Sequence, residues 1–84
     1  MTYEVFFSDL ALKQLRKLDL EIRQRIIATI ERIRIRPDEY VRKLVGDDVY
    51  RLRVGNYRVL LDLNEEKLII LVLRIGHKRN VYDL

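Results

Sequence analysis

Three arginines stand close together in residues 50–58, at a spacing that allows them to bind a phosphate group. Basic and apolar residues alternate on both sides of Gly55 and Asn56, a two-residue turn of the kind that closes a β-hairpin. Such a turn fixes the register, so that Arg53 opposes Arg58 and Arg51 lies on the same side of the sheet. Because guanidinium groups bind phosphate oxygens through paired hydrogen bonds, the hairpin predicts an anion-binding face.

The direct opposition of Arg53 and Arg58 is unfavourable by itself, because like charges in a cross-strand pair destabilise a sheet. A local arrangement that breaks a stability rule without an evident partner indicates a functional role. An anionic ligand would relieve the repulsion. The structural alternative is that Asp62 and carboxylates of the neighbouring loop neutralise the arginines.

A second polar group, residues 76–82, follows the most apolar run of the chain and ends in a tyrosine. Because this segment begins where a buried strand is expected to end, it could fold back over the arginines. His77 is the one histidine of the chain, and histidine is the side chain whose ordinary pKa lies near neutrality, which makes it a candidate for proton transfer. A structural hydrogen bond of His77 at the strand end, or a surface or anchoring role for the whole tail, is the alternative.

The part of the chain before this hairpin predicts a strand followed by two helices. Residues 2–7 are rich in β-branched and aromatic side chains, and Ser8 is suited to cap the helix that follows. Asp19 is expected to start the second helix and Pro37 to end it. Apolar residues recur at helical spacing, namely Leu10, Ala11, Leu15 and Leu18 in the first helix and Ile22, Ile26, Ile30 and Ile33 in the second.

The part after the helices predicts a loop and three strands. Residues 38–48 are polar and are expected to form the loop, and strands are expected over 49–54, 57–63 and 67–75. Residues 68–73 are apolar without alternation, so this strand should lie inside the sheet with both faces covered. All 84 residues then form one α+β domain of order β-α-α-β-β-β. Its helical hairpin packs on one face of a mostly antiparallel four-stranded sheet.

The composition excludes several kinds of site. The chain has no cysteine and one histidine, so it cannot build a disulfide, a thiolate site or a histidine cluster, and neither metal nor cofactor is expected. Seventeen basic against thirteen acidic residues favour a polyanion or an acidic protein as partner. No apolar run approaches the roughly 20 residues of a membrane span, and the first residues do not look like a signal peptide. We therefore expect a cytoplasmic protein with no membrane partner.

The hairpin and the tail together resemble two motifs of a toxin superfamily. Residues 50–60, YRLRVGNYRVL, are similar to the "yRlRvGdYRvly" signature of the RelE/ParE toxin superfamily. Residues 75–82, IGHKRNVY, are similar to the "vgHRreVY" ending of its RelE-like branch. The expected order of strand, helical hairpin and three strands matches as well, so the resemblance covers the whole chain.

The resemblance implies the toxin of a type II toxin-antitoxin pair, an endoribonuclease or mRNA interferase that inhibits translation. Such enzymes cut messenger RNA in the ribosomal A site without a metal: the ribose 2′-hydroxyl attacks the adjacent phosphate and leaves a 2′,3′-cyclic phosphate. The implied partners are mRNA, the ribosome and a small acidic RelB-like antitoxin. We expect the antitoxin to lay a helix or strand across uncovered apolar surface and to bring acidic groups near the arginines.

The residues predicted to take part in catalysis lie in the hairpin and the tail: Arg51, Arg53, Arg58, His77, Lys78, Arg79 and Tyr82. The arginines and the lysine of this set, together with Arg74, are expected to bind RNA. The resemblance makes Tyr82 the tail tyrosine that stacks on a base. The general acid of the family aligns with Lys78 when the glycine is the anchor, and with Arg79 when the tyrosine is.

Arg51 and Arg53 stand where the best-known bacterial relatives have lysines. Because arginine keeps its proton, these residues are poor general bases, and a mechanism with lysine as the base cannot transfer unchanged. We expect the three hairpin arginines to stabilise the charge of the phosphorane, and proton transfer to fall to Tyr82, His77 or Lys78.

Two other functions remain open. A ParE-like poison of DNA gyrase shares the fold and acts by binding protein, although the basic pair before Val81 and Tyr82 favours the RelE-like branch. A catalytically weak member that mainly binds its antitoxin is the other alternative, because both lysines are absent.

Overall fold

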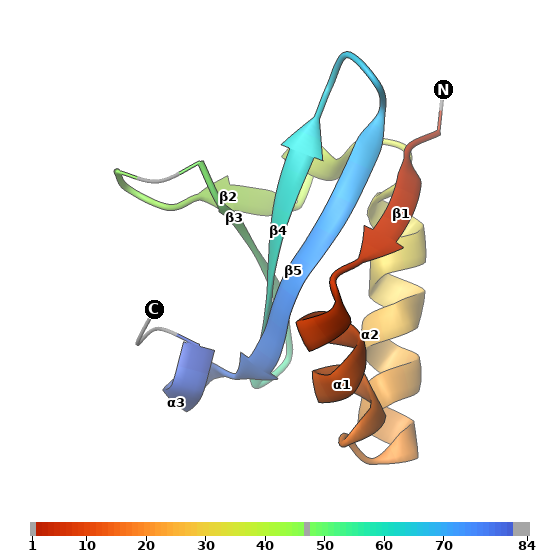
Figure 1. Ribbon diagram of the computed structural model, residues 1–84, viewed down its shortest axis with the longest axis vertical. Coiled ribbons are helices and arrows are strands. Elements are labelled where there is room, and N and C mark those ends of the chain that lie inside the picture. Colours follow the sequence, from red (N-terminus) through yellow and green to blue (C-terminus); the bar gives the residue numbers. More distant parts are fainter. Residues whose placement is uncertain (1, 47, 82–84) are drawn as a thin grey trace.

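Two helices cover one face of a five-stranded sheet in the computed structural model, which describes residues 2–46 and 48–81 (Figure 1). The strand order is β1-β5-β4-β3-β2, with β1 parallel to β5 and the other neighbours antiparallel. The predicted α+β class and the helical hairpin are confirmed. The elements are β1 (Glu4–Phe7), α1 (Asp9–Arg16), α2 (Leu20–Ile33), the 3₁₀ helix η1 (Pro37–Glu39), β2 (Val41–Lys43), β3 (Tyr50–Val54), β4 (Tyr57–Asn64), β5 (Ile69–His77) and α3 (Lys78–Val81).

The two long helices begin where the sequence predicts. Ser8 caps α1, because its Oγ accepts a hydrogen bond from the Ala11 N–H at 3.0 Å, and Asp19 is the N-cap residue of α2. Two details of the predicted apolar stripe are wrong: Leu10 is 47% exposed, and Leu18 lies beyond the end of α1. Eight residues make only about two turns, so this helix can bury only one narrow side.

The prediction of a loop over residues 38–48 is wrong in part, because this stretch contains β2. The strand pairs antiparallel with β3, with Arg42 opposite Arg51, and makes the sheet five-stranded within the described residues rather than four-stranded. Three residues with two adjacent charges give too short a pattern for sequence reasoning to detect. Short, charged strands are typical of sheet edges, where they discourage pairing with another chain.

The most apolar strand, β5, lies between β1 and β4, as predicted. Ile70, Val72 and Ile75 are buried in the core beneath the helices. Ile69 and Leu71 alternate with them and are only half-buried on the other face. The expected cover on both faces is therefore incomplete within the described chain.

Helix α1 completes the edge of β5 at the point where β1 ends. The Ser8 N–H donates to the Val72 carbonyl at 2.9 Å, and the Ser8 hydroxyl donates to the Leu73 carbonyl at 2.8 Å. Further along α1, Gln14 Oε1 accepts a hydrogen bond from the Ile75 N–H at 2.7 Å. A shift of register in β4–β5 pairing lies beside these bonds, so side chains replace the missing strand where the sheet is irregular.

The hairpin of β3 and β4 has the predicted register throughout. Its five residue pairs run from Tyr50 opposite Leu61 to Val54 opposite Tyr57, and they include Arg53 opposite Arg58. Gly55 has a φ of +58°, a conformation that side chains other than glycine rarely adopt, so the tight turn depends on this residue.

Candidate anion-binding site

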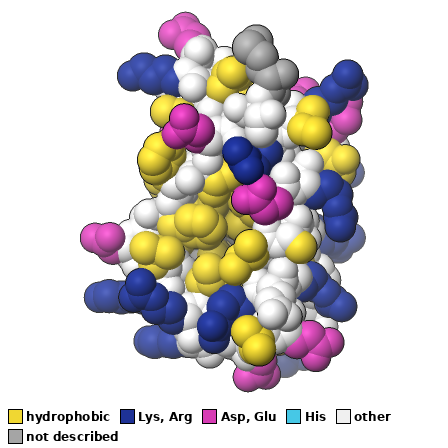
Figure 2. All heavy atoms as spheres, turned by 90° about the vertical axis from the view of Figure 1, so that its right-hand side faces the viewer, with side chains coloured by type: hydrophobic (Ala, Val, Ile, Leu, Met, Phe, Trp, Pro, Cys, Tyr) yellow, Lys and Arg dark blue, Asp and Glu magenta, His cyan; other side chains and the backbone are white. Residues whose placement is uncertain are grey.

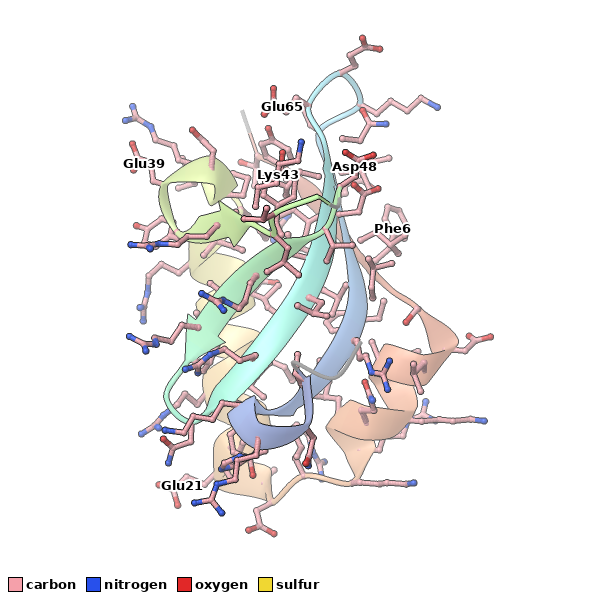
Figure 3. All side chains as sticks on the ribbon, turned by 90° about the vertical axis from the view of Figure 1, so that its left-hand side faces the viewer. Phe6, Glu21, Glu39, Lys43, Asp48 and Glu65 are labelled. Atoms are coloured by element: carbon pink, nitrogen blue, oxygen red, sulfur yellow. The ribbon has the colours of Figure 1, made fainter. Side chains whose placement is uncertain are left out.

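A basic pocket of about 330 Å³ lies on the sheet face opposite the two long helices (Figure 3). We call it the arginine pocket; its lining residues are Tyr40, Arg42, Arg51, Arg53 and Arg58. Its arginines alternate along the strands with core residues such as Leu52 and Val59, which explains why they share the other face. In Figure 3, nitrogen-tipped side chains gather beside β2 and β3. The pocket brings together all three hairpin arginines named from the sequence.

The opposed arginines of the hairpin differ in their environments. Arg58 is only 4% exposed, and its Nη1 donates to the carbonyl oxygens of Gly55 and Tyr57, both at 2.8 Å. Arg53 is exposed, and its side chain has no hydrogen bond or ion pair within the part of the chain that the structure describes. The repulsion between the two is thus eased by the turn carbonyls, which draw one guanidinium inward, and the other remains available to an anion.

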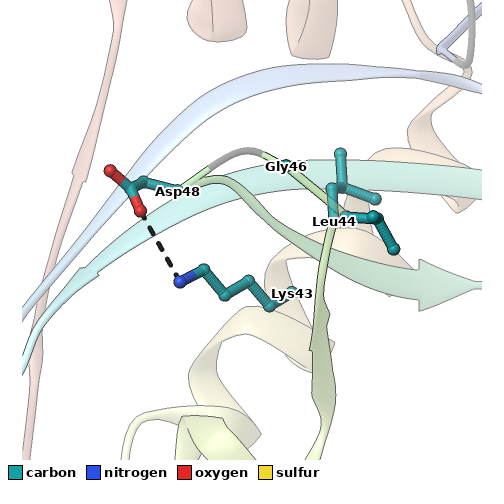
Figure 4. Close-up of a pocket in the computed structure, with 5 residues that line it drawn as sticks. Lys43, Leu44, Gly46 and Asp48 are labelled. Carbon is teal, nitrogen blue, oxygen red and sulfur yellow. Dashed lines mark ion pairs between the residues drawn. The ribbon is translucent and has the colours of Figure 1, made fainter.

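Asp62, the first carboxylate of the structural alternative, does not neutralise the arginines within the described residues. Asp62 lies opposite Leu71 and forms no ion pair within the described residues. In the loop between β2 and β3, Asp48 pairs with Lys43 at 3.6 Å, in an open cavity of about 480 Å³ (Figure 4). An exposed pair of this kind contributes little to stability and lines a different cavity from the arginine pocket.

One row of cross-strand neighbours connects the arginine pocket with Arg74. Arg42 lies opposite Arg51, Arg51 opposite Leu60, and Leu60 opposite Arg74. Arg74 thus lies on the predicted face, but it does not line the pocket, because the buried Leu60 separates it from Arg51 by about 10 Å, two strand spacings.

The tail turns back onto the pocket's side of the sheet as helix α3 (Figure 1). Gly76 lies opposite Arg58, and a Cβ at this glycine would come within 2.6 Å of Val81 Cγ2, so α3 packs directly on the bare backbone. The Lys78 N–H donates to the Asn56 carbonyl at 2.8 Å, which ties α3 to the hairpin turn. Lys78, which is exposed on α3, therefore lies at the turn end of β3 and β4, the strands that bear the hairpin arginines.

Arg79 is also exposed on α3, whereas the last tail residue of the prediction, Tyr82, lies outside the described residues. The role of Tyr82 stays a prediction.

His77 is not brought together with the arginine pocket. Its ring stacks edge-on against Tyr57, with centroids 5.4 Å apart, and its Nδ1 accepts a hydrogen bond from the Arg79 N–H at 3.2 Å. Tyr57 packs against the core beneath the helices, so the imidazole lies on the face opposite the arginines. The geometry fits the structural alternative, in which His77 fixes the start of α3; its catalytic role stays untested.

Two pocket residues, Tyr40 and Arg42, were missed by sequence reasoning. Both belong to the stretch predicted as a loop, and only the unrecognised strand β2 brings Arg42 beside Arg51. The sequence shows an aromatic and a basic residue two positions apart, but it does not show that they lie near the hairpin.

An apolar groove of about 210 Å³ lies on the opposite side of the molecule, between β1 and the long helices. Its lining residues are Val5, Phe7, Leu15, Ile27, Ile30 and Glu31. Figure 2 shows this side, with hydrophobic side chains gathered in a hollow. Glu31 at the rim pairs with Arg34 at 2.7 Å.

Two further features are absent from residues 2–46 and 48–81. No group of three or more histidine, aspartate or glutamate side chains is arranged there to hold a metal ion. No helix within the same ranges is long and apolar enough to cross a membrane.

Comparison with known proteins shows the class of this chain, the toxins of type II toxin-antitoxin systems. The family model described as the ParE toxin of the type II system parDE matches residues 5–82. The chain therefore belongs to the ParE toxin family, within the RelE/ParE superfamily to which the hairpin and tail motifs point.

Individual relatives carry RelE names. A RelE-like toxin protein of Escherichia coli is 34% identical over an alignment of 89 positions, which covers 100% of this chain and 94% of the relative. Toxin RelE3 of Methanocaldococcus jannaschii is 31% identical, over 95% of this chain and 96% of its own length. Among solved structures, the intact RelBE toxin-antitoxin complex of E. coli is 29% identical with a TM-score of 0.75, over 89% of this chain and 95% of that one. The chain is thus a RelE-like toxin of a type II system.

Proposed function

We propose that this toxin is a metal-independent endoribonuclease that cuts messenger RNA in the ribosomal A site and so inhibits translation. The observation that supports this most directly is the arginine pocket, in which Arg51, Arg53 and Arg58 converge with space for a phosphate. In the proposed reaction the ribose 2′-oxygen bonds to phosphorus while the bond to the 5′-oxygen breaks. One proton leaves the 2′-hydroxyl and another reaches the departing 5′-oxygen.

The arginines act on charge in this mechanism and not on protons. Negative charge builds up on the phosphate oxygens as the fifth bond forms, and arginine is the side chain best suited to bind such oxygens bidentately. Arg58, held by two carbonyls, is fixed in position before substrate arrives, which lowers the cost of organising the site. Proton transfer is left to the tail, with Lys78 and Arg79 on α3 and Tyr82 beyond it as the candidates.

We infer further that the toxin is held inactive by a small acidic antitoxin of the RelB kind. The E. coli relative whose structure is a toxin-antitoxin complex supports this partner. On this chain the apolar groove offers a hydrophobic seat for a helix or strand, and acidic side chains of the same partner would meet the arginines.

The test is toeprinting of ribosomes arrested on a defined message after addition of the purified toxin. The wild-type chain should produce cuts in the A site, and Arg53→Ala should slow them about a hundredfold or more, because one oxyanion donor is lost. Arg32→Ala is the matched control, since it removes the same charge from an exposed position on α2 outside the pocket. It should cut near the wild-type rate.

Two results would overturn the proposal. Intact messages together with gyrase-linked DNA breaks would favour the ParE-like alternative. The matching family model, which is described as a ParE toxin, is the reason to test it. Intact messages without such breaks, in cells that grow normally on induction, would identify a member that mainly binds its antitoxin.

A further inference from the structure

We propose that Tyr40 and Arg42 form a nucleobase subsite at the edge of the arginine pocket, in which the Tyr40 ring stacks on an unpaired base of single-stranded RNA. The inference rests on the proposed function and deepens it. The hairpin arginines bind the reacting phosphate, and this pair binds the nucleotide beside it.

The backbone holds Tyr40 firmly in place at the rim of the pocket. The residue follows η1, whose first residue, Pro37, is buried, and the Tyr40 N–H donates to the Pro37 carbonyl at 3.0 Å. Its chain continues directly into β2, which is paired with β3. The side chain is 49% exposed and lines the pocket. An aromatic ring anchored on both sides of its backbone loses little freedom when a base stacks on it.

Exposure alone would not distinguish Tyr40, because single exposed hydrophobic residues are ordinary on protein surfaces. Tyr40 differs from such residues because it lines one cavity together with four arginines. The cavity has a volume of about 330 Å³, which is within the range of ligand sites. Arg42 is exposed and lies opposite Arg51, so cationic groups continue from the hairpin up to the aromatic ring. A positive groove with an aromatic platform is the usual construction for binding single-stranded nucleic acid, in which phosphates meet the cations and bases stack on the rings.

An RNA fits this edge better than a protein partner does. The apolar groove, the surface suited to a hydrophobic segment, lies on the other side of the molecule, next to α1 and α2. Around Tyr40 the pocket offers cations and one ring, and no apolar side chain lines it among the described residues.

The test is a double-mutant cycle, in which RNA affinity is measured after removal of the tyrosine ring, of one base, and of both. The probe is a fluorescein-labelled hexaribonucleotide with 2′-O-methyl groups, which cannot react through its 2′-oxygens, and a series of the same probe with one abasic ribose at each position. For the wild-type chain, one abasic position should weaken binding about tenfold. In Tyr40→Ala the intact probe should bind about tenfold more weakly, and the abasic position should cost nothing further. Tyr40→Phe, which keeps the ring, should behave as wild type.

The salt concentration must be the same throughout, because phosphate contacts weaken steeply with salt. Val45→Ala is the matched control: it trims a fully exposed apolar side chain outside the pocket and should leave binding unchanged. The subsite is overturned if the abasic and Tyr40→Ala losses multiply, if Tyr40→Phe is as weak as Tyr40→Ala, or if Tyr40→Ala weakens only the complex with the protein encoded by the neighbouring gene. If any of these results occurs while A-site cutting stays normal, the subsite is wrong and the proposed function stands. If the wild-type chain binds no probe, the subsite is overturned, and the result also counts against RNA binding by the arginine face as a whole.

Discussion

The two arginines that face each other across the hairpin show how one motif contains side chains with different tasks. Arg58 is buried, and two carbonyl oxygens of the turn accept its hydrogen bonds. Arg53 is exposed on the neighbouring strand. Arg58 therefore supports the turn and lines the arginine pocket, whereas Arg53 lines the pocket without supporting the turn.

This difference predicts a contrast in stability. Arg58→Ala should lower the free energy of unfolding by about 2 kcal/mol, because hydrogen bonds from a charged donor are lost and carbonyls of the turn are left without it. Arg53→Ala should change it by no more than about 0.5 kcal/mol, since an exposed charge opposite a like charge contributes little. Urea unfolding of both variants measures the contrast.

The control is Arg32→Ala, which removes an exposed arginine from α2. Equal losses of stability in the two hairpin variants would contradict the separate tasks of Arg53 and Arg58. So would a stable Arg58→Ala variant.

At the scale of residues, the sequence predicts the sheet face on which a side chain lies better than how deeply that side chain is buried. A two-residue turn and the alternation of a strand determine the face for each arginine, and the structure confirms that face. Alternation does not determine whether a long side chain extends into solvent or folds back, so the burial of Arg58 could not be predicted. Tyr40 could not be placed either, since the strand that follows it was not recognised.

At the scale of elements, helix α1 acts as a substitute for a strand. Beyond Phe7, where β1 ends, β5 loses its parallel neighbour, and polar side chains of α1 and its cap take over its backbone hydrogen bonds. A buried backbone N–H without an acceptor would be costly, so Gln14 has a specific structural role.

Gln14 can therefore be tested by a pair of substitutions of similar size. Gln14→Leu leaves the Ile75 N–H without its acceptor and should cost about 1–3 kcal/mol of unfolding free energy. Gln14→Glu keeps an oxygen at the same reach and should cost clearly less. Hydrogen exchange of the Ile75 amide should be faster in the leucine variant. Equal stability of the two variants, or an unchanged exchange rate, would show that the bond does not support β5.

The elements that sequence reasoning found are those with long or strongly patterned segments. The helical stripe of α2 spans enough residues for its period to be clear, the apolar run of β5 is long, and the glycine turn has a characteristic sequence. The three residues of β2 do not, and its pairing depends on contacts with β3 that no local pattern encodes. The interaction between α1 and the bulged edge of β5 likewise depends on residues about sixty positions apart.

At the scale of the whole molecule, two surfaces of opposite character lie on opposite sides of the sheet. The arginine pocket is cationic, and the apolar groove is hydrophobic and bordered by the long helices (Figures 2 and 3). If RNA uses the first surface and the antitoxin anchors in the second, toxicity and neutralisation should be separable by single substitutions.

Ile27 provides the final test, because it lines the groove and is 41% exposed, so a charge there need not disturb the core. Ile27→Asp should weaken antitoxin binding by about 2 kcal/mol, since complex formation would bury an unpaired carboxylate. Cells that express this variant with the neighbouring antitoxin gene should stop growing, while A-site cutting by the purified toxin stays normal. Leu20→Asp is the control: the same change at a 61% exposed residue of α2 outside the groove should leave neutralisation intact. Full neutralisation of Ile27→Asp would contradict the groove as the anchoring surface, and loss of cutting in the same variant would contradict the separation of the two faces.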